Sequence, residues 1–380
     1  MAPQARRRPR SPLARLVSAQ GWPYVLTPMI PIAIVLELAH ANHTAIFISS
    51  ALAVIPPAAL MGKATEELAA RSGPGIGGLL NVTFGNFPEL VIAFFALLEG
   101  LQEVVKASLI GSIIGNILLV LGAAMLVGGI KRPFQTFQPA AVGAQSAMLL
   151  LAVAALVMPA VFQLVDGGSL PSPGAEEVNF GSTVEHLSLA VAIVLMASYL
   201  LGLLFSLRTH RDVFNPEHEL EPAGWTMRQS VIALAIAGVV VGLMSEILVG
   251  SIAEAAKSIG LSEFFIGAIV VAIVGNVAEH WVAVYVAYRD KMDLAVNIAI
   301  GSSTQIALFV APLLVLLSFV FGDQPMALVF NGFELAAVIL AVLIANRVTI
   351  EGRSNWFEGV QLLSVYVVIA LAFGYAQRAG

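Results

Sequence analysis

Gly275-Asn276-Val277-Ala278-Glu279-His280 places an amide, a carboxylate and an imidazole inside a long apolar segment. A similar stretch, Gly85-Asn86-Phe87-Pro88-Glu89, lies 190 residues earlier in a chain of 380. A carboxylate in the hydrocarbon core of a membrane costs about 2.5–3.5 kcal/mol on insertion scales, so an acid there indicates a functional site. The matched pair favours this interpretation over simple helix packing by polar groups.

The composition is that of a membrane protein. Hydrophobic residues make up 58% of the chain and charged residues only 11%, against about 25% charged in soluble domains. The chain contains no cysteine, which excludes disulfides, zinc–thiolate sites, iron–sulfur clusters and thiol nucleophiles. We therefore expect an all-α polytopic membrane protein.

Apolar runs of about 17–25 residues, long enough to cross a bilayer, predict about 11 transmembrane helices. Their ranges are 22–39, 44–62, 74–99, 104–129, 138–161, 184–206, 229–256, 262–288, 293–321, 325–346 and 356–376. Lysine and arginine collect in cytoplasmic loops. With a cytoplasmic N-terminus and an external C-terminus, only three of the 19 basic residues fall outside cytoplasmic segments: Lys106, Lys257 and Arg378.

The chain also contains an internal repeat. Gly111-Ser112 and Gly301-Ser302 are separated by the same 190 residues as the two acidic motifs, and a shared offset is the signature of a duplicated unit. The acidic motifs lie on the third and eighth predicted spans, an odd number apart, so the two copies cross the membrane in opposite directions. Inverted repeats are typical of secondary transporters, whose sites lie near the midplane where the repeats meet.

Each Gly-Asn-x-x-Glu motif is suited to bind a cation. Residues three apart on a helix share a face, so Asn86 and Glu89 in one copy, and Asn276 and Glu279 in the other, can direct oxygens at one point. Ca²⁺ takes six to eight oxygen ligands in irregular geometry. Two side-chain pairs fall short of that number, so backbone carbonyls are expected to contribute.

A break in the helix would supply such carbonyls. Pro88 lacks an N–H, so we expect the carbonyl of Phe84 to lose its helical partner and become free to coordinate a metal. Gly85 and Gly275 let the backbone bend or unwind at the same level. Because the second copy has Ala278 in place of Pro88, the freed carbonyl is expected in one repeat only.

The same carboxylates explain how transport is driven. Glu89 and Glu279 each hold a proton or a share of a divalent cation, and these states compete at one place. Competition at one site is the minimum requirement for antiport. The doubly protonated and cation-loaded sites are both neutral, whereas the empty dianion is costly to move through hydrocarbon. His280 points about 100° away from Glu279 on an ideal helix and is interpreted as a proton relay or orienting partner.

Further polar residues lie on the spans that follow each motif. They are second candidates for the cation pathway, and interhelical hydrogen bonding is the alternative explanation. The set is Ser112, Asn116, Ser302, Ser303 and Gln305. Near the span ends, Glu66, Glu246 and Glu254 are candidates for an access path, although snorkelling to the interface explains them equally well.

Four motifs in order resemble those of the cation/proton exchangers (the CAX type, Ca²⁺/H⁺ antiporters) of the calcium/cation antiporter superfamily. They are Gly85-Asn86-Phe87-Pro88-Glu89-Leu90, Gly111-Ser112-Ile113-Ile114-Gly115-Asn116, Gly275-Asn276-Val277-Ala278-Glu279-His280 and Gly301-Ser302-Ser303-Thr304-Gln305-Ile306-Ala307-Leu308. The resemblance covers both halves and implies export of cytoplasmic Ca²⁺ in exchange for H⁺. By that similarity Glu89 and Glu279 bind cation and protons, and Asn86, Asn276 and nearby carbonyls complete the site. The Glu279-His280 pair is similar to the proton-coupled branch rather than the sodium-coupled one.

The resemblance further implies one leading helix plus two inverted five-helix repeats. The expected parts are a basic cytoplasmic N-terminus with the first helix (1–43), a first repeat (44–207), a cytoplasmic connecting loop (208–228) and a second repeat (229–380). The segment 22–39 is alternatively a cleaved signal peptide. We expect a multi-pass protein of the inner cell membrane that contacts the lipid bilayer, with no cofactor and no nucleic-acid partner. The sequence leaves open whether the chain forms a homo-oligomer.

The sequence leaves two possibilities for the cation that is exchanged for H⁺. Many relatives carry small residues where this chain has Phe87-Pro88, so exchange of Na⁺ or K⁺ for H⁺ is the alternative to Ca²⁺/H⁺ exchange. A channel would need a continuous polar pathway, against which the dense apolar sequence around the acids argues. The chain is not expected to be an enzyme, because it has no Cys nucleophile, no His-Glu-x-x-His motif and no Gly-x-Ser-x-Gly motif.

Overall fold

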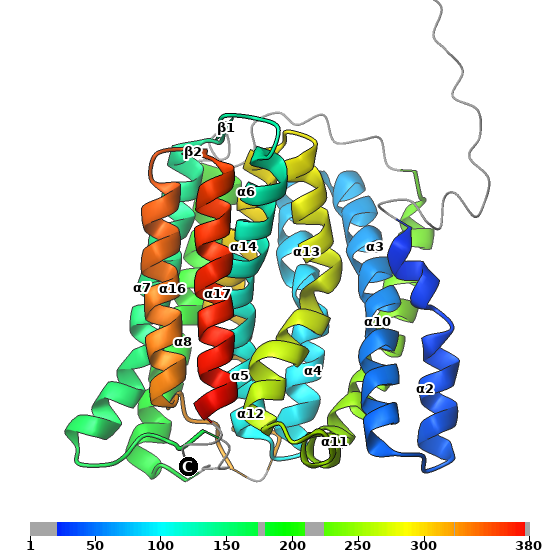
Figure 1. Ribbon diagram of the computed structural model, residues 1–380, viewed down its shortest axis with the longest axis vertical. Coiled ribbons are helices and arrows are strands. Elements are labelled where there is room, and N and C mark those ends of the chain that lie inside the picture. Colours follow the sequence, from blue (N-terminus) through cyan, green and yellow to red (C-terminus); the bar gives the residue numbers. More distant parts are fainter. Residues whose placement is uncertain (1–20, 174–178, 210–223, 323, 377–380) are drawn as a thin grey trace, which may run out of the picture.

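The computed structural model describes residues 21–173, 179–209, 224–322 and 324–376. In this part of the chain, helices of membrane length lie side by side in one bundle (Figure 1). Nine of the described helices are long and apolar enough to cross a membrane, and two shorter apolar segments, Trp22–Leu38 and Phe87–Leu98, accompany them. The prediction of an all-α polytopic membrane protein is confirmed, with nine full-length spans and two shorter segments where the sequence predicts about 11 spans.

The described residues of the first half form ten helical elements. They are η1 (Trp22–Leu26), α2 (Met29–Leu38), α3 (His43–Gly85), α4 (Phe87–Leu98), α5 (Gln102–Ile114), the π-helical turn η2 (Gly115–Val120), α6 (Leu121–Gly129), α7 (Pro139–Val165), α8 (Ser182–Leu204) and the π-helical turn η3 (Phe205–Thr209). The helix α3 begins after Asn42, whose side chain accepts a hydrogen bond from the Thr44 N–H. Such a cap satisfies one of the free donors of a first helical turn.

In the second half, the part of the chain that the structure describes also forms ten helical elements. They are α10 (Met227–Gly250), α11 (Ile252–Ile259), α12 (Glu263–Phe265), the π-helical turn η4 (Ile266–Val271), α13 (Ala272–Tyr288), α14 (Met292–Gln305), the π-helical turn η5 (Ile306–Val310), α15 (Ala311–Ser318), α16 (Gly332–Thr349) and α17 (Trp356–Ala376). Reciprocal capping boxes, Thr226 with Gln229 and Asn331 with Glu334, begin α10 and α16. Two short strands, β1 (Gln135–Thr136) and β2 (Arg353–Ser354), pair antiparallel at one end of the bundle (Figure 1).

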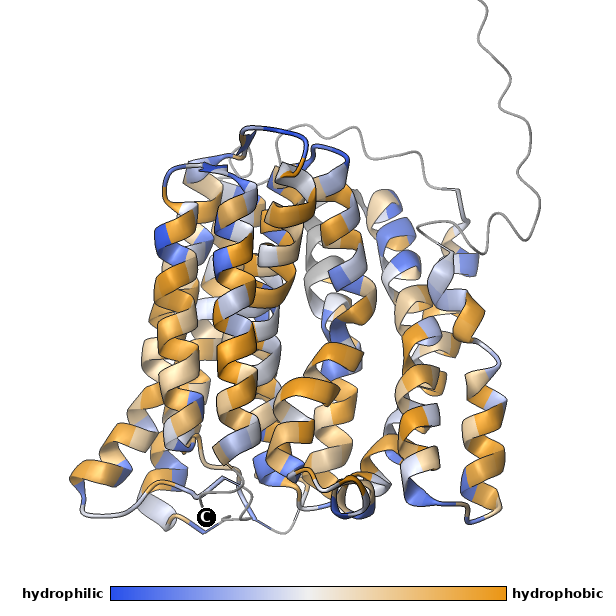
Figure 2. Cartoon of the chain, viewed as in Figure 1, coloured by the Kyte–Doolittle hydropathy of each residue, from blue (hydrophilic) through white to orange (hydrophobic). Residues whose placement is uncertain are grey.

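The distribution of polarity fits a membrane. Figure 2 shows apolar residues along the helices and polar residues gathered in the connections at both ends. Polar residues also appear at mid-height on α13 (Figure 2), and Asn276 on this helix is fully buried. The bundle therefore buries its polar centre away from both ends, as the sequence pattern predicts.

The two halves repeat the same local geometry in opposite directions. In Figure 1, α4 runs toward the end of the bundle that carries the C-terminus, and α13 runs away from it. Each helix ends in a left-handed residue, Gly100 (φ 75°) and Asp290 (φ 64°), which are 190 positions apart. The residue after each left-handed position closes the same six-residue turn. The Leu101 N–H donates to the carbonyl oxygen of Ala96, and the Lys291 N–H donates to that of Val286, both at 2.9 Å. The π-helical turns η2 and η5 also recur at this offset.

Small residues let the central helices of the two halves touch backbone to backbone. Every residue of α5 is buried. A Cβ atom on Gly111 of α5 would lie 2.0 Å from the carbonyl oxygen of Ala268 in η4, and one on Gly267 would lie 2.9 Å from that of Val104. Glycine at these contacts is what permits the close approach, as is common between membrane helices.

The predicted span 325–346 begins later than expected. A buried extended segment, Met326 to Asn331, comes first, and α16 begins at Gly332. Its backbone groups bond to side chains: the Met326 N–H donates to Ser318 Oγ (2.8 Å) and the Leu328 N–H to Ser188 Oγ (3.0 Å). Apolar residues can therefore be buried without helix, because other elements satisfy their backbone.

A buried lysine fastens this extended segment to α5. Lys106 is fully buried, pairs with Glu103, and donates from Nζ to the carbonyl oxygen of Val329 at 2.8 Å. Its ammonium also lies 5.1 Å from the ring centroid of Phe180. Glu334 is fully buried in the same region, and its Oε2 accepts the Asn331 N–H.

Removing this cation tests how much the cluster stabilises the fold. We expect Lys106→Met to lower stability by about 3–5 kcal/mol, because it leaves Glu103 buried without a countercharge. Lys106→Met combined with Glu103→Gln removes both charges and is expected to recover most of the loss. The thermal unfolding midpoint of the purified protein measures both effects, and a double variant as unstable as the single one would contradict this account.

Candidate cation-binding site

The first acidic motif lies at a break between two helices. The helix α3 ends at Gly85, Asn86 has non-helical dihedral angles (φ −97°, ψ 21°), and α4 begins at Phe87. Pro88 occupies the first turn of α4, where a missing N–H leaves no acceptor unsatisfied. Glu89 is in the same turn, and the free N–H groups of a helix N-terminus favour a negative charge there.

One expected feature of this break is absent. We predicted a free carbonyl on Phe84, but this oxygen accepts a hydrogen bond from the Asn86 N–H. The break lets Asn86 turn back onto Phe84, which replaces the helical donor that Pro88 lacks. The carbonyl of Phe84 is therefore not an unpaired ligand in this structure.

The second motif lies on an unbroken helix. We predicted a bend or unwinding at Gly275, but α13 continues through it from Ala272 to Tyr288. Ala278 takes the position equivalent to Pro88, so the helix keeps its N–H there. The irregular backbone lies one turn earlier, in η4. The two repeats thus present similar side chains from different backbones.

Each glycine faces the glutamate of the opposite motif. A Cβ atom on Gly275 would lie 3.0 Å from Glu89 Cγ, and one on Gly85 would lie 3.5 Å from Glu279 Oε1. Glu89 and Glu279 are close enough for their carboxylates to repel each other electrostatically. The motifs therefore cross at their glycines and bring the two acids to one place.

The asparagines are anchored across the repeats by their NH₂ groups. Asn86 Nδ2 donates to Gln305 Oε1 at 2.5 Å. Asn276 Nδ2 donates to Ser112 Oγ at 3.1 Å and to the carbonyl oxygen of Ala272 at 3.0 Å. Both Oδ1 atoms are buried and have no hydrogen-bond partner among the described residues. The amides therefore keep their acceptor atoms available.

The two acids differ in their surroundings. Glu279 is partly exposed and accepts a hydrogen bond at Oε2 from Ser302 Oγ (2.8 Å). Glu89 is only 9% exposed, and neither of its carboxylate oxygens has a partner in the part of the chain described. With the two amide oxygens, this leaves four buried acceptor atoms without a donor. Buried polar groups without partners are costly, and a cluster of acceptors is what a bound cation would stabilise.

The second candidates divide into two groups. Ser112, Ser302 and Gln305 contact the motif residues directly, and Asn116 Oδ1 lies 3.0 Å from His280 Nε2. Since an amide oxygen only accepts, this contact requires the proton on Nε2. Ser303 instead donates to backbone carbonyl oxygens, of Ala299 at 2.9 Å and of Ile113 at 3.3 Å. Ser303 therefore packs helices, as the alternative explanation predicts.

Two further residues lie near this site. Gln145 on α7 was not among the sequence candidates, although it is an amide in the interior of the predicted span 138–161. Its Nε2 lies 4.0 Å from where a Cβ on Gly301 would be, and its Oε1 is buried without a partner among the described residues. Glu66 on α3 is exposed and lies within electrostatic range of Glu279. Glu254 forms an exposed ion pair with Lys257 at 3.1 Å instead.

No group of three or more His, Asp or Glu side chains is arranged as metal ligands among the described residues. The candidate site instead combines two acids with amide and hydroxyl side chains. Its parts come from two helical repeats that run in opposite directions through one bundle. This architecture defines the class of polytopic membrane proteins that includes secondary transporters.

Comparison with known proteins gives the family. The chain belongs to the sodium/calcium exchanger protein family, which it matches over residues 42–208 and 229–375. It is 45% identical to a Ca(2+)/H(+) antiporter of Synechocystis sp., over 92% of this chain and 96% of that protein. It is 43% identical to the Ca(2+)/H(+) antiporter ChaA of Bacillus subtilis, over 90% and 96% of the two chains.

A solved structure is similar over nearly the whole chain. Native YfkE superposes with a TM-score of 0.77 at 38% identity, covering 93% of this chain and 99% of that one. The predicted relationship to the cation/proton exchangers is confirmed, as is the prediction that the chain is a transporter and not an enzyme.

The crossing of the two motifs can be tested with alanine. A Cβ on Gly275 meets Glu89 Cγ at 3.0 Å, whereas one on Gly85 has only ordinary contacts. Overpacking of this kind costs about 1–3 kcal/mol, so Gly275→Ala is expected to weaken Ca²⁺ binding by on the order of tenfold and Gly85→Ala by less. Titration calorimetry measures the binding. Gly143→Ala is the control, since no atom lies within 4 Å of its Cβ position; equal losses in all three variants would contradict the crossing.

Proposed function

We propose that the protein exports Ca²⁺ from the cytoplasm in exchange for H⁺, and that Glu89 and Glu279 bind either the cation or protons at one site. The observation that carries this proposal is the cluster of buried oxygen atoms without donors where the two motifs cross. The proposal is supported by the relatives of Synechocystis and Bacillus subtilis, which are named Ca(2+)/H(+) antiporters.

The donor set suits Ca²⁺. Two carboxylates provide up to four oxygens, and Asn86 and Asn276 add one each. The resulting six reach the lower end of the six to eight oxygens that Ca²⁺ takes in proteins. Hard oxygen ligands without sulfur or a free imidazole also favour Ca²⁺ over softer metals. The Oε1 of Gln145, which is buried without a partner among the described residues, is a candidate for a further amide oxygen.

Proton coupling follows from the same acids. Two carboxylates held near each other away from water repel, and this repulsion is relieved either by protons or by one divalent cation. The loaded forms are neutral and can change conformation, whereas the empty dianion is costly to move through hydrocarbon. His280 would orient or relay protons beside Glu279, held by its contact with Asn116.

Access to the site is expected to alternate between the two sides. Glu279 has a larger exposed fraction than Glu89, which supports access to the site from the side of Glu279. Glu66, which lies within electrostatic range of Glu279, is between Lys63 and Arg71 on α3. Both basic residues contact Trp225, just before α10 begins. Because basic residues gather at this end of the bundle, we assign it to the cytoplasm together with the N-terminus, and the C-terminus to the outside.

Proton release from inverted membrane vesicles with an acid interior tests this function. We expect added Ca²⁺ to release protons through the unmodified protein and not through Glu89→Gln or Glu279→Gln. Glu254→Gln is a matched control, because that carboxylate is exposed and paired with Lys257, and it should retain activity. Release by Na⁺ or K⁺ but not by Ca²⁺ would overturn the proposed substrate, and ion flux without proton flux would overturn antiport.

The hydrogen bond from Ser302 to Glu279 allows a second test of the role of Glu279 in Ca²⁺ transport. A hydrogen bond to a charged group contributes about 1.5–3 kcal/mol, so Ser302→Ala is expected to raise the Ca²⁺ concentration for half-maximal transport by on the order of tenfold. Ser303→Ala is the control, since this neighbouring hydroxyl bonds to backbone carbonyls only. An equal effect of both substitutions would indicate loss of helix packing instead.

A further inference from the structure

A cavity lies away from the crossed motifs. It has a volume of about 430 Å³ and is formed where α6 and α13 end. It lies at the end of the bundle that carries β1 and β2 (Figure 1). Three of its six lining residues are basic; the full set is Val127, Ile130, Lys131, Arg132, Tyr288 and Arg289.

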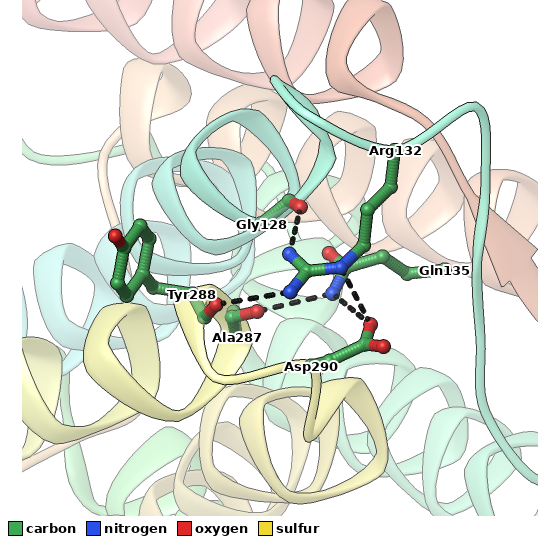
Figure 3. Close-up of polar contacts among 6 residues, drawn as sticks. All are labelled: Gly128, Arg132, Gln135, Ala287, Tyr288 and Asp290. Carbon is green, nitrogen blue, oxygen red and sulfur yellow. Dashed lines mark hydrogen bonds and ion pairs between the residues drawn. The ribbon is translucent and has the colours of Figure 1, made fainter.

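One of the basic residues forms a fixed wall. Figure 3 shows Arg132 reaching from the α6 end to the turn after α13. Its Nη1 donates to the carbonyl oxygen of Gly128 (2.8 Å), its Nη2 to that of Tyr288 (3.4 Å), and its Nε lies 3.2 Å from Asp290 Oδ1. Arg132 therefore neutralises the carbonyl ends of two helices from opposite repeats, which would otherwise repel an anion.

Gln135 completes this wall. Its Nε2 donates to the carbonyl oxygen of Ala287 (3.0 Å) and to Asp290 Oδ1 (3.1 Å) (Figure 3). Asp290, the acid in this group, is thus shared by Arg132 and Gln135. Arg132 and Gln135 are therefore fixed in place by groups of both helix ends, without any ligand.

The other two basic residues keep their charge available. Lys131 is exposed and has no ion pair among the described residues. The guanidinium of Arg289 contacts a neutral partner, Tyr285, through its hydroxyl (3.3 Å) and its ring (6.0 Å to the centroid). The cavity consequently presents two positive charges that no carboxylate in this described region balances.

The remaining lining is apolar and faces outward. Ile130 is 63% exposed and Tyr288 is 51% exposed, and Val127 lies one turn deeper on α6. A bare phosphate ion would leave most of the cavity empty and these groups in contact with water. A ligand with a phosphate and an attached hydrocarbon part would cover both kinds of surface.

We propose that this cavity binds the phosphate headgroup of an anionic phospholipid, with Lys131 and Arg289 holding the phosphate, Arg132 forming the wall, and Ile130 and Tyr288 covering the first part of the acyl chains. Basic pockets between membrane helices at the cytoplasmic side are suited to such headgroups. The bound lipid would bridge the ends of α6 and α13 and so brace the helix that carries Glu279 and His280. The inference does not depend on which ion the protein transports.

Lipid retention by the purified full-length protein tests this site. In phosphatidylcholine nanodiscs, dioleoylphosphatidylglycerol is titrated and bound lipid is counted by native mass spectrometry. Each basic side chain near a membrane surface contributes about 1 kcal/mol, so Lys131→Gln with Arg289→Gln is expected to weaken retention by on the order of 30-fold. The thermal unfolding midpoint in phosphatidylcholine alone should equal that of the unmodified protein. If the double variant is unstable, Lys131→Gln alone is used, with an expected loss of about fivefold.

The controls separate this site from diffuse attraction and from soluble anions. Arg228→Gln with Arg347→Gln removes the same charge at the same end of the bundle, outside the cavity, and should leave retention unchanged. Equal losses in both double variants would overturn the proposal in favour of a general surface charge. Inorganic phosphate at matched ionic strength should neither displace the lipid nor raise the unfolding midpoint, and if it does either, a soluble anion and not a lipid is the ligand.

Discussion

The rest of the structure depends on the reciprocal contact between the two acidic motifs. Charge in hydrocarbon is costly, and two acids can share one site only if their helices approach closely. Gly85 and Gly275 permit this, because neither has a side chain to hold off the glutamate of the opposite motif. The same device recurs beside the site, where Gly111 lets α5 touch the backbone of η4. Glycine contacts thus position the acids and hold the halves together.

Most of the fold could be predicted from the sequence because duplication leaves a measurable offset. The 190-residue spacing predicts the paired motifs, and the structure extends the same offset to the turns at Gly100 and Asp290 and to the π-helical turns, which the sequence analysis did not predict. The extended segment before Gly332 could not be predicted in this way. Its apolar residues look like the start of a span, but its backbone bonds to side chains on other elements, including Ser188 and Lys106, which are 140 and 223 residues from their partners. Hydropathy averaged over neighbouring residues does not detect partners so far away in sequence.

The candidate site was predictable in its residue types and less so in its backbone. The structure brings together the two motifs that contain Asn86, Glu89, Asn276 and Glu279. These residues could be selected because polar side chains at helical spacing, repeated in two apolar segments, are recognisable in the sequence. The helix at Gly275 is continuous, since glycine permits a break but does not impose one. A proline within the helix removes a hydrogen bond, and only the first copy has one. Gln145 lacked a repeated counterpart, so the offset gave no reason to select it.

The two repeats make unequal hydrogen bonds at equivalent positions, and this asymmetry gives the two acids different surroundings. At the 190-residue offset Ser112 corresponds to Ser302, yet Ser302 donates to Glu279 while Ser112 accepts from Asn276. One acid is therefore stabilised and partly exposed, and the other is buried without a partner. A serine hydroxyl accepts and donates at the same time, so the bond from Asn276 leaves the Ser112 proton available for an acceptor such as Glu89. The two serines therefore differ in whether their proton is already bonded to an acid, although they occupy equivalent positions in the repeats.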